Sequence, residues 1–350
     1  MGSVAASDRM VVAVAVVGLV ALTLTVVMAL QVLVMRYRAG WRERRRALVL
    51  AQWRPLLFSW IVGEEPPLPQ LLRSDEETFL LLWNHLQDGV LGEARARLRQ
   101  AGRAVGAHRM AQGRLLRKGA VGRLLALRTL GYLGLESDYA DVARWLDDRR
   151  TYLCVAAARA LVQIAPARAA ADILARLARR VDWPVALFAT LLADADTDAT
   201  ARHFREVLQG LPRESLVRLL PLVTVLDGRA ANEIVGGLLA NSTDPEVLSA
   251  ALKRVESPHL LSHVRRACSH ENWVVRTQAA AALGRVGEKA DRESLLRLLC
   301  DSNWWVRYRA AQAVLSGRFG SQAEVTAAAG ALGDRYAHDI LEQVRAEVTG

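Results

Sequence analysis

The sequence has few aromatic residues and few cysteines. These shortages restrict the fold class and the cellular environment that we expect. Aromatic residues make up 6% of the 350 residues, whereas alanine, leucine and arginine are abundant, and this composition favours helix over strand. No segment sustains an alternation of apolar and polar residues, so we expect no strands. The three cysteines, Cys154, Cys268 and Cys300, form no C-x-x-C pair and no disulfide framework, which favours a reducing, cytosolic environment.

Charged residues are absent between Met10 and Met35, a segment of 26 residues. At about 1.5 Å per residue, a helix of this length exceeds a hydrocarbon core of roughly 30 Å and can cross a bilayer with some tilt. The alternatives are a buried helix of a soluble protein and a cleaved signal peptide, whose apolar stretch is shorter and follows positive charge. Here the arginines come afterwards, so we predict one transmembrane helix over residues 10–35.

The positive charge is concentrated beside this apolar segment. The formal net charge is +10, and the stretch from Arg36 to Arg128 contains 18 basic and 8 acidic residues. Positive residues flanking a membrane helix remain on the cytoplasmic side. We therefore predict a single-pass protein of the inner, cytoplasmic membrane, with residues 1–9 outside and the C-terminal domain in the cytosol.

Residues 36–74 combine arginines with tyrosine and tryptophan and end in a proline-rich linker that contains Pro66, Pro67 and Pro69. Tyrosine and tryptophan favour the membrane interface, and clustered arginines are attracted to anionic headgroups. A solvated flank without lipid contact is the alternative. The candidate lipid-interface residues are Arg36, Tyr37, Arg38, Trp41, Arg42, Arg44, Arg45, Arg46, Trp53 and Trp60.

Helix-sized pieces separated by glycine and proline follow this segment, and they repeat. Ser74 and Glu77 have the spacing of a capping box, which predicts that a long amphipathic helix starts at Asp75. Farther along, residues 272–284 (NWVVRTQAAAALG) lie 31 residues before residues 303–315 (NWWVRYRAAQAVL). Self-similarity at this period, built from paired helices, indicates an α-solenoid.

The repeated pattern D-x-x-P-x-V-R-x-x-A-A-x-A-L resembles the second helix of a HEAT repeat. Its closest copy begins at Asp301 and has Trp304 where the pattern has proline, whereas His270 and Cys154 replace the aspartate and the arginine in other copies. The resemblance implies an all-α fold, an α-solenoid of HEAT-like helix pairs over residues 75–350 preceded by one N-terminal transmembrane helix. The alanines should let neighbouring helices approach closely, and the arginine should reach back to Asp301 or to a loop carbonyl.

The tryptophans at the start of these helices have two interpretations. We expect Trp273, Trp304 and Trp305 to pack between repeats, because each would bury a large apolar surface there. The alternative follows from the resemblance: second helices line the concave face of such solenoids, where aromatic residues beside arginine suit a protein-binding site. The candidate protein-binding residues are Trp273, Arg276, Trp304, Trp305, Arg307, Tyr308 and Arg309.

Catalytic and cofactor-binding motifs are missing. No G-x-S-x-G, Walker A or G-x-G-x-x-G pattern occurs, so we expect no enzyme, no catalytic residue and no cofactor. His259 and His263 lie four residues apart but lack the carboxylate of an H-E-x-x-H site, so no metal site is expected. Asp196 and the aspartates beside it should cap a helix rather than bind calcium. The repeats are balanced in charge, so we expect no nucleic acid.

These features together predict a membrane-tethered cytosolic scaffold that binds a membrane-associated partner protein through its repeat surface. The bilayer is the second partner, contacted through residues 10–35 and the arginines that follow. The architecture also resembles bacterial membrane-anchored HEAT repeat proteins, which implies an accessory role beside a membrane glycosyltransferase of envelope polysaccharide synthesis. The alternatives are a HEAT-like enzyme of the lyase or glycosylase type and a solenoid that binds nucleic acid.

Overall fold

The computed structural model describes residues 2–117 and 119–349, with side chains described from Leu22 onward except at residues 118, 322, 348 and 349. Within these residues every regular element is a helix and none is a strand, as the composition predicts. The chain divides into two compact units, Met1–Leu133 and Gly134–Gly350.

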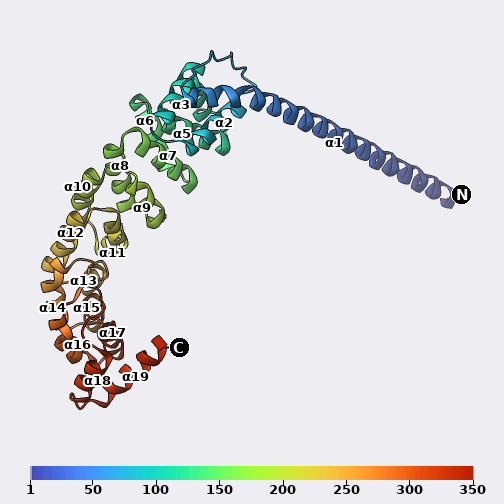
Figure 1. The fold of residues 1–350 in the computed structure, drawn as a ribbon. Helices are drawn as coiled ribbons and strands as arrows, with labels where there is room; N and C mark the ends of the chain where they lie inside the picture. Colours follow the sequence, from blue (N-terminus) through green and yellow to red (C-terminus); the bar gives the residue numbers. More distant parts are fainter. Residues whose placement is uncertain (1, 118, 350) are drawn as a thin grey trace. The chain divides into compact units, whose positions relative to one another are not determined.

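The first unit contains five helices, and the first of them is by far the longest (Figure 1). The C-terminal part of this helix packs against two of the shorter helices, while the part from Leu22 to Val34 is exposed. In chain order the helices are α1 (Gly2–Val62), α2 (Glu76–Gly89), α3 (Gly92–Val105), α4 (Ala107–Leu115) and α5 (Ala120–Leu133).

The last turns of α1 form part of the core of this unit. Val49, Trp53, Leu57 and Trp60 follow a helical spacing of three and four residues and are all buried. The indole of Trp53, only 2% exposed, meets the ring of Phe79 edge-on at 4.8 Å. The prediction that Trp53 and Trp60 lie at the lipid interface is therefore wrong, because both side chains are covered by protein.

The start of α2 also differs from the prediction. Asp75 is the residue before the helix, but its side chain makes no capping hydrogen bond, and Ser74 donates to the Asp75 carboxylate rather than to backbone at 3.1 Å. The predicted capping box of Ser74 with Glu77 does not form, because the helix begins at Glu76 with Asp75 as the cap residue, and the Glu77 carboxylate accepts from Arg114 instead. The long helix predicted from Asp75 is broken after Gly89, and a new helix begins at Gly92, whose φ of +59° lies in the left-handed region.

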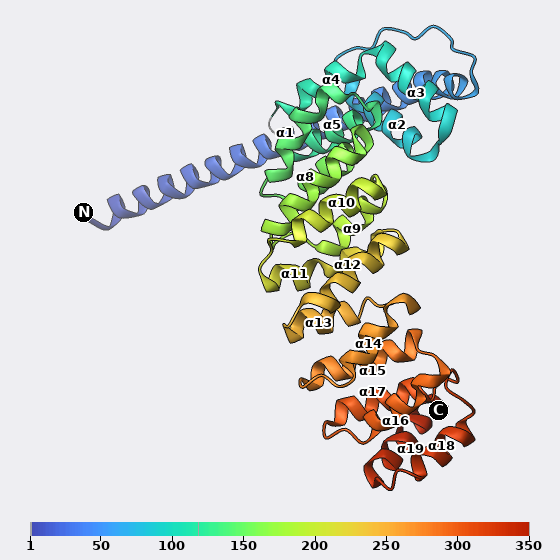
Figure 2. The same cartoon turned by 90° about the vertical axis from the view of Figure 1, so that its left-hand side faces the viewer.

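The second unit is a solenoid of helix pairs, stacked one after another (Figure 2). Helices α8, α10, α12 and α14 follow one another in one row, and α11, α13, α15, α17 and α19 follow in the other, on the inner side of the unit's curve in Figure 1. The elements are η1 (Glu136–Asp138), α6 (Tyr139–Ala143), η2 (Arg144–Asp147), α7 (Thr151–Ile164), α8 (Pro166–Arg179), α9 (Val185–Ala193), α10 (Thr197–Leu208), α11 (Arg213–Leu219), η3 (Leu220–Val225), α12 (Gly228–Asn241), α13 (Pro245–Leu252), η4 (Pro258–Leu260), α14 (Leu261–Ala267), α15 (Trp273–Val286), η5 (Lys289–Asp291), α16 (Arg292–Leu299), α17 (Trp304–Val314), α18 (Gln322–Gly330) and α19 (Arg335–Thr349).

The alanine pattern has the predicted effect where α15 meets α17. The alanines at equivalent positions of the two helices are buried, and a methyl group added at Gly284 would lie 3.0 Å from the Cβ of Ala313. Small side chains therefore bring these two backbones close together, while Leu283 and Val314 fill the space beside them.

Side chains bind the backbone carbonyls of the turns within the helix pairs. Arg307 donates to the backbone carbonyl of Asp301 at 2.7 Å, as the repeat pattern predicts. At the equivalent turn of an earlier pair, the thiol of Cys154 contacts the carbonyl of Asp148 at 3.0 Å, and Arg180, the residue that follows α8, donates to the same carbonyl at 3.2 Å. The missing arginine is therefore replaced by a guanidinium from the end of the next helix along the chain.

Candidate functional site

Three aromatic side chains form a cluster on the first turns of α17, which we call the aromatic cluster: Trp304, Trp305 and Tyr308. The Trp304 and Tyr308 rings stack at 5.0 Å with an interplanar angle of 15°, and the Trp305 ring meets Trp304 edge-on at 4.8 Å. Asn303 caps the helix by accepting from the backbone N–H of Trp305 at 2.9 Å, which fixes where the helix and hence the rings begin. On the neighbouring helix α15, Trp273 holds the same first position after a capping asparagine.

The tryptophans of both helices are exposed rather than packed between repeats. The exposed fraction of the side chain is 42% for Trp273, 39% for Trp304 and 54% for Trp305. The expectation that these residues fill the seam is therefore wrong, because buried alanines occupy the seam where α15 meets α17, whereas the tryptophans on the first turns of these helices remain exposed. Ring surface that protein does not cover is available to a binding partner.

The candidate arginines divide into two groups. Arg276 binds the carboxylate of Asp301 and two loop carbonyls, and its side chain is only 16% exposed. Its role is therefore structural, and we remove it from the candidate binding residues. Arg307 is tied to the loop carbonyls before α17. Arg309 is exposed. Among the described residues, its guanidinium donates to the side chain of Gln312 on the same helix, at 2.8 Å. Only Arg309 therefore presents its charge openly beside the aromatic cluster.

Helix α19 supports the aromatic cluster, which the repeat pattern did not predict. The hydroxyl of Tyr308 donates to the carboxylate of Glu347 at 2.7 Å, and this contact raises the pKa of Tyr308 and lowers that of Glu347. The ring of Tyr336 lies 5.4 Å from the guanidinium carbon of Arg307. No sequence signal identified these two residues, because α19 carries no copy of the repeated motif.

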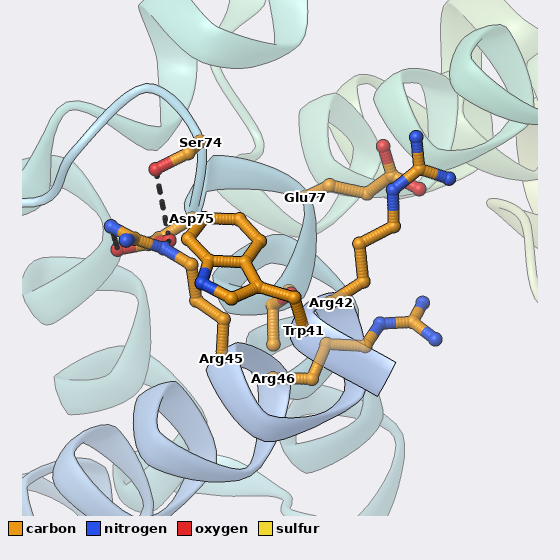
Figure 3. A pocket seen from close by; sticks show the side chains of 8 residues that line it. Trp41, Arg42, Arg45, Arg46, Ser74, Asp75 and Glu77 are labelled. Carbon is orange, nitrogen blue, oxygen red and sulfur yellow. Dashed lines mark hydrogen bonds and ion pairs between the residues drawn. The ribbon is translucent and has the colours of Figure 1, made fainter. Parts of the chain in front are cut away.

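A second candidate site lies in the first unit, where α1 passes the start of α2. It is a pocket of about 580 Å³, which we call the arginine pocket, and Figure 3 shows its side chains. The lining residues are Trp41, Arg42, Arg45, Arg46, Ser74, Asp75, Glu77 and Thr78. Four of these were predicted at the lipid interface, and the fold adds a second wall from the start of α2.

Charge in the arginine pocket is only partly balanced. Arg45 forms a bidentate pair with Asp75, at 2.7 and 3.2 Å, and these hydrogen bonds hold the pKa of Asp75 below its usual value. Glu77 accepts from Arg114 at 3.3 Å. Among the residues that the structure describes, Arg42 and Arg46 have no carboxylate partner and both are exposed. Two guanidinium groups therefore face solvent without an ion-pair partner.

The remaining predicted lipid-interface residues also lie on the exposed surface of α1: Arg36, Tyr37, Arg38 and Arg44. From Leu22 onward, α1 contains an apolar stretch that is long enough to cross a membrane by length and composition. The predicted span also includes residues 10–21. The side chains of residues 1–21 are not among those that the structure describes. One apolar helix near the N-terminus is thus a candidate for a single membrane span.

Residues considered for metal binding occupy separate places. His259 lies in η4 and His263 in α14, and no group of three potential ligands gathers in the described part of the chain. Asp196 caps α10 by accepting from the N–H of Ala199 at 2.7 Å, which confirms the capping interpretation. Burial raises the pKa of Cys268 to about 12, which keeps its thiol protonated and unreactive near neutral pH.

Two overlapping segments, residues 233–316 and 257–349, match the family model described as HEAT repeats. Together the two segments cover residues 233–349, about a third of the chain, and this part carries HEAT-like repeats. The aromatic cluster and its supports on α19 all lie within the matched residues. The chain is also similar to a crystal structure of an engineered protein, with 17% identity, 76% of this chain and 84% of that chain covered, and a TM-score of 0.31. A search of curated proteins found no match.

Proposed function

We propose that this protein is a membrane-tethered scaffold that binds a partner protein through its HEAT repeats. The observation that supports this proposal is the exposed aromatic cluster of α17 with Arg309 beside it. Aromatic residues and arginine are the residue types that contribute most to the binding energy of protein interfaces. The exposed surfaces of these side chains make no packing contact within the described part of the second unit. HEAT repeats in general present extended surfaces to partner proteins.

Contacts within the second unit hold the rings of the aromatic cluster. Tyr308 is held by Glu347, and Trp304 stacks on Tyr308, so the rings have few orientations to lose on binding. Binding through a rigid surface avoids part of the entropic cost of association. The site therefore suits a specific, stable contact better than a loose one.

The exposed apolar side chains of α1 support the membrane tether. Leu22, Leu24, Met28 and Leu33 are each about 60% exposed, and burial in a bilayer would remove this surface from water. A tether raises the effective concentration of a membrane-bound partner without any added contact. The partner is therefore proposed to be a membrane protein, and the resemblance noted above suggests a glycosyltransferase of envelope polysaccharide synthesis.

Site-directed photocrosslinking in native membranes tests the scaffold proposal. A photoreactive amino acid replaces Trp305 in the full-length chain, and a matched chain carries it at Arg297, which is exposed on α16 of the same repeat. We expect one discrete adduct with an integral membrane protein from position 305, none from position 297, and loss of the adduct with Arg309→Gln. Equal adducts from both positions, or adducts with soluble proteins alone, would contradict the proposal.

A further inference from the structure

We propose that the arginine pocket binds the phosphomonoester of an anionic lipid headgroup at the cytoplasmic surface of the membrane. This inference rests on the proposed membrane tether and adds a specific ligand to it. The attraction of clustered arginines to a charged membrane is general, whereas a pocket with two walls selects one kind of headgroup.

The charge of the pocket fits a phosphomonoester. Both lining carboxylates have an arginine partner: Asp75 is paired with Arg45, and Glu77 shares Arg114 with Glu76. Arg42 and Arg46 remain, one helical turn apart on the same face of α1. A phosphomonoester carries a charge between about −1.5 and −2 near pH 7, close to that of two guanidinium groups, whereas a phosphodiester carries about −1.

The uncharged lining completes the match. Trp41 is 54% exposed and packs against Arg45, whose guanidinium carbon lies 5.5 Å from the ring. In the view of Figure 3, Arg45 and Asp75 lie on one side of this indole and Arg42 and Arg46 on the other. Ser74 lines the opposite wall, and its hydroxyl donates to the Asp75 carboxylate. The indole offers the apolar edge, and the guanidinium groups of Arg42 and Arg46 offer the hydrogen bonds, that a lipid headgroup requires.

The pocket lies at a suitable height along α1. Arg42 is seven residues beyond Met35, the end of the apolar segment, which is about 10 Å along a helix axis. The headgroup layer of a leaflet is roughly 5 to 8 Å thick, and long arginine side chains extend back toward it. The mouth of the pocket is therefore within reach of phosphates at the outer edge of that layer.

Native mass spectrometry of the full chain in detergent micelles tests this proposal. Phosphatidic acid, a phosphomonoester, and phosphatidylglycerol, a phosphodiester, are added in equal amounts with matched acyl chains. We expect at least fivefold more adducts with phosphatidic acid, and loss of this preference in the double variant Arg42→Gln, Arg46→Gln. The matched control, Arg36→Gln with Arg38→Gln, removes two charges from the same helix outside the pocket and should keep the preference within about twofold.

The contrary outcomes are equally specific. If both double variants lost the preference for phosphatidic acid equally, general electrostatic attraction rather than the pocket would hold the lipid, and the proposal would be overturned. A wild type without a preference between the two lipids would also overturn it. Displacement of the lipid by excess glycerol 1-phosphate would reject the lipid source and assign the pocket to a soluble phosphomonoester. Alkaline extraction of native membranes reports separately on the tether, so failure of the anchor and failure of the pocket give different results.

Discussion

The carboxylate of Asp301, in the turn before α17, accepts hydrogen bonds from the guanidinium of Arg276 on α15, at 2.6 and 2.9 Å. The same guanidinium donates to the carbonyls of His270 and Glu271, and the same carboxylate accepts from the N–H of Asn303. One ion pair therefore ties the turn of one HEAT repeat to the turn of the next. Both side chains are largely covered, so solvent screens this pair much less than the pairs on exposed helix faces.

Loss of this pair should destabilise the HEAT repeats strongly. Replacing Asp301 by asparagine leaves the buried guanidinium of Arg276 without its counter-charge, and we expect the free energy of unfolding to fall by about 3 kcal/mol. The matched control is Asp339→Asn in the exposed pair with Arg335, where the change should stay below about 1 kcal/mol. Urea unfolding followed by circular dichroism measures both. Equal effects of the two substitutions would show that the Asp301 pair has no special role.

The same pair should make stability depend on pH in the acidic range. Burial alone raises the pKa of Asp301, but hydrogen bonds from Arg276 and the N–H of Asn303, with the charges of Arg276 and Arg307, outweigh burial and lower this pKa below its usual value. A carboxylate whose pKa is lowered by folding stabilises the folded state above its unfolded pKa of about 3.9 and loses this contribution as the pH falls through the folded pKa.

We therefore expect the difference in melting temperature between the wild type and Asp301→Asn to be constant from about pH 8 to pH 5 and to shrink below about pH 4. Thermal melts of both proteins across this range provide the measurement. A difference that grows as the pH falls would mean that the sign of the pKa shift is wrong.

Two glycines within helices should respond in opposite ways to the same substitution. Gly237 in α12 has open space where a Cβ would lie, so alanine there should stabilise the helix by about 0.5 to 1 kcal/mol through backbone entropy. Gly284 in α15 faces Ala313, and an added Cβ would lie only 3.0 Å from the Cβ of that residue. Alanine at position 284 should therefore give no gain or a loss. Equal stabilisation at both sites would show that α15 and α17 are less tightly packed than the contact indicates.

The sequence predicted the repeats well, because the features that form a HEAT seam are local. Small residues at fixed spacing, an asparagine cap and an arginine six residues after a loop carbonyl each belong to one helix and its turn, as residues 301–314 demonstrate. Contacts between distant segments left no such pattern. Trp53 is of a residue type that favours the membrane interface. Only its contact with Phe79 in the folded unit shows that it belongs to the core.

The candidate sites could be predicted only in part for the same reason. The arginines of α1 and the tryptophans of α17 stand out by composition, but their surroundings come from other elements. Ser74 and Asp75 complete the arginine pocket, and Glu347 supports Tyr308 across 39 positions of sequence. Exposure depends on which helix covers which face, so the choice between a packing and a binding role for Trp305 required the fold.

That choice can be tested by comparing Trp305 with Trp53. Trp53 is 2% exposed and packs on Phe79, so replacing it by alanine should lower the free energy of unfolding of the first unit by about 4 kcal/mol, the usual loss for a large buried side chain. Trp305 is 54% exposed, and alanine there should cost less than about 1 kcal/mol, as is usual for surface positions. Urea unfolding of the two full-length variants gives both values. If Trp305→Ala destabilised the protein as much as Trp53→Ala, the tryptophan would be a packing residue, and the aromatic cluster would lose its claim to be a binding surface.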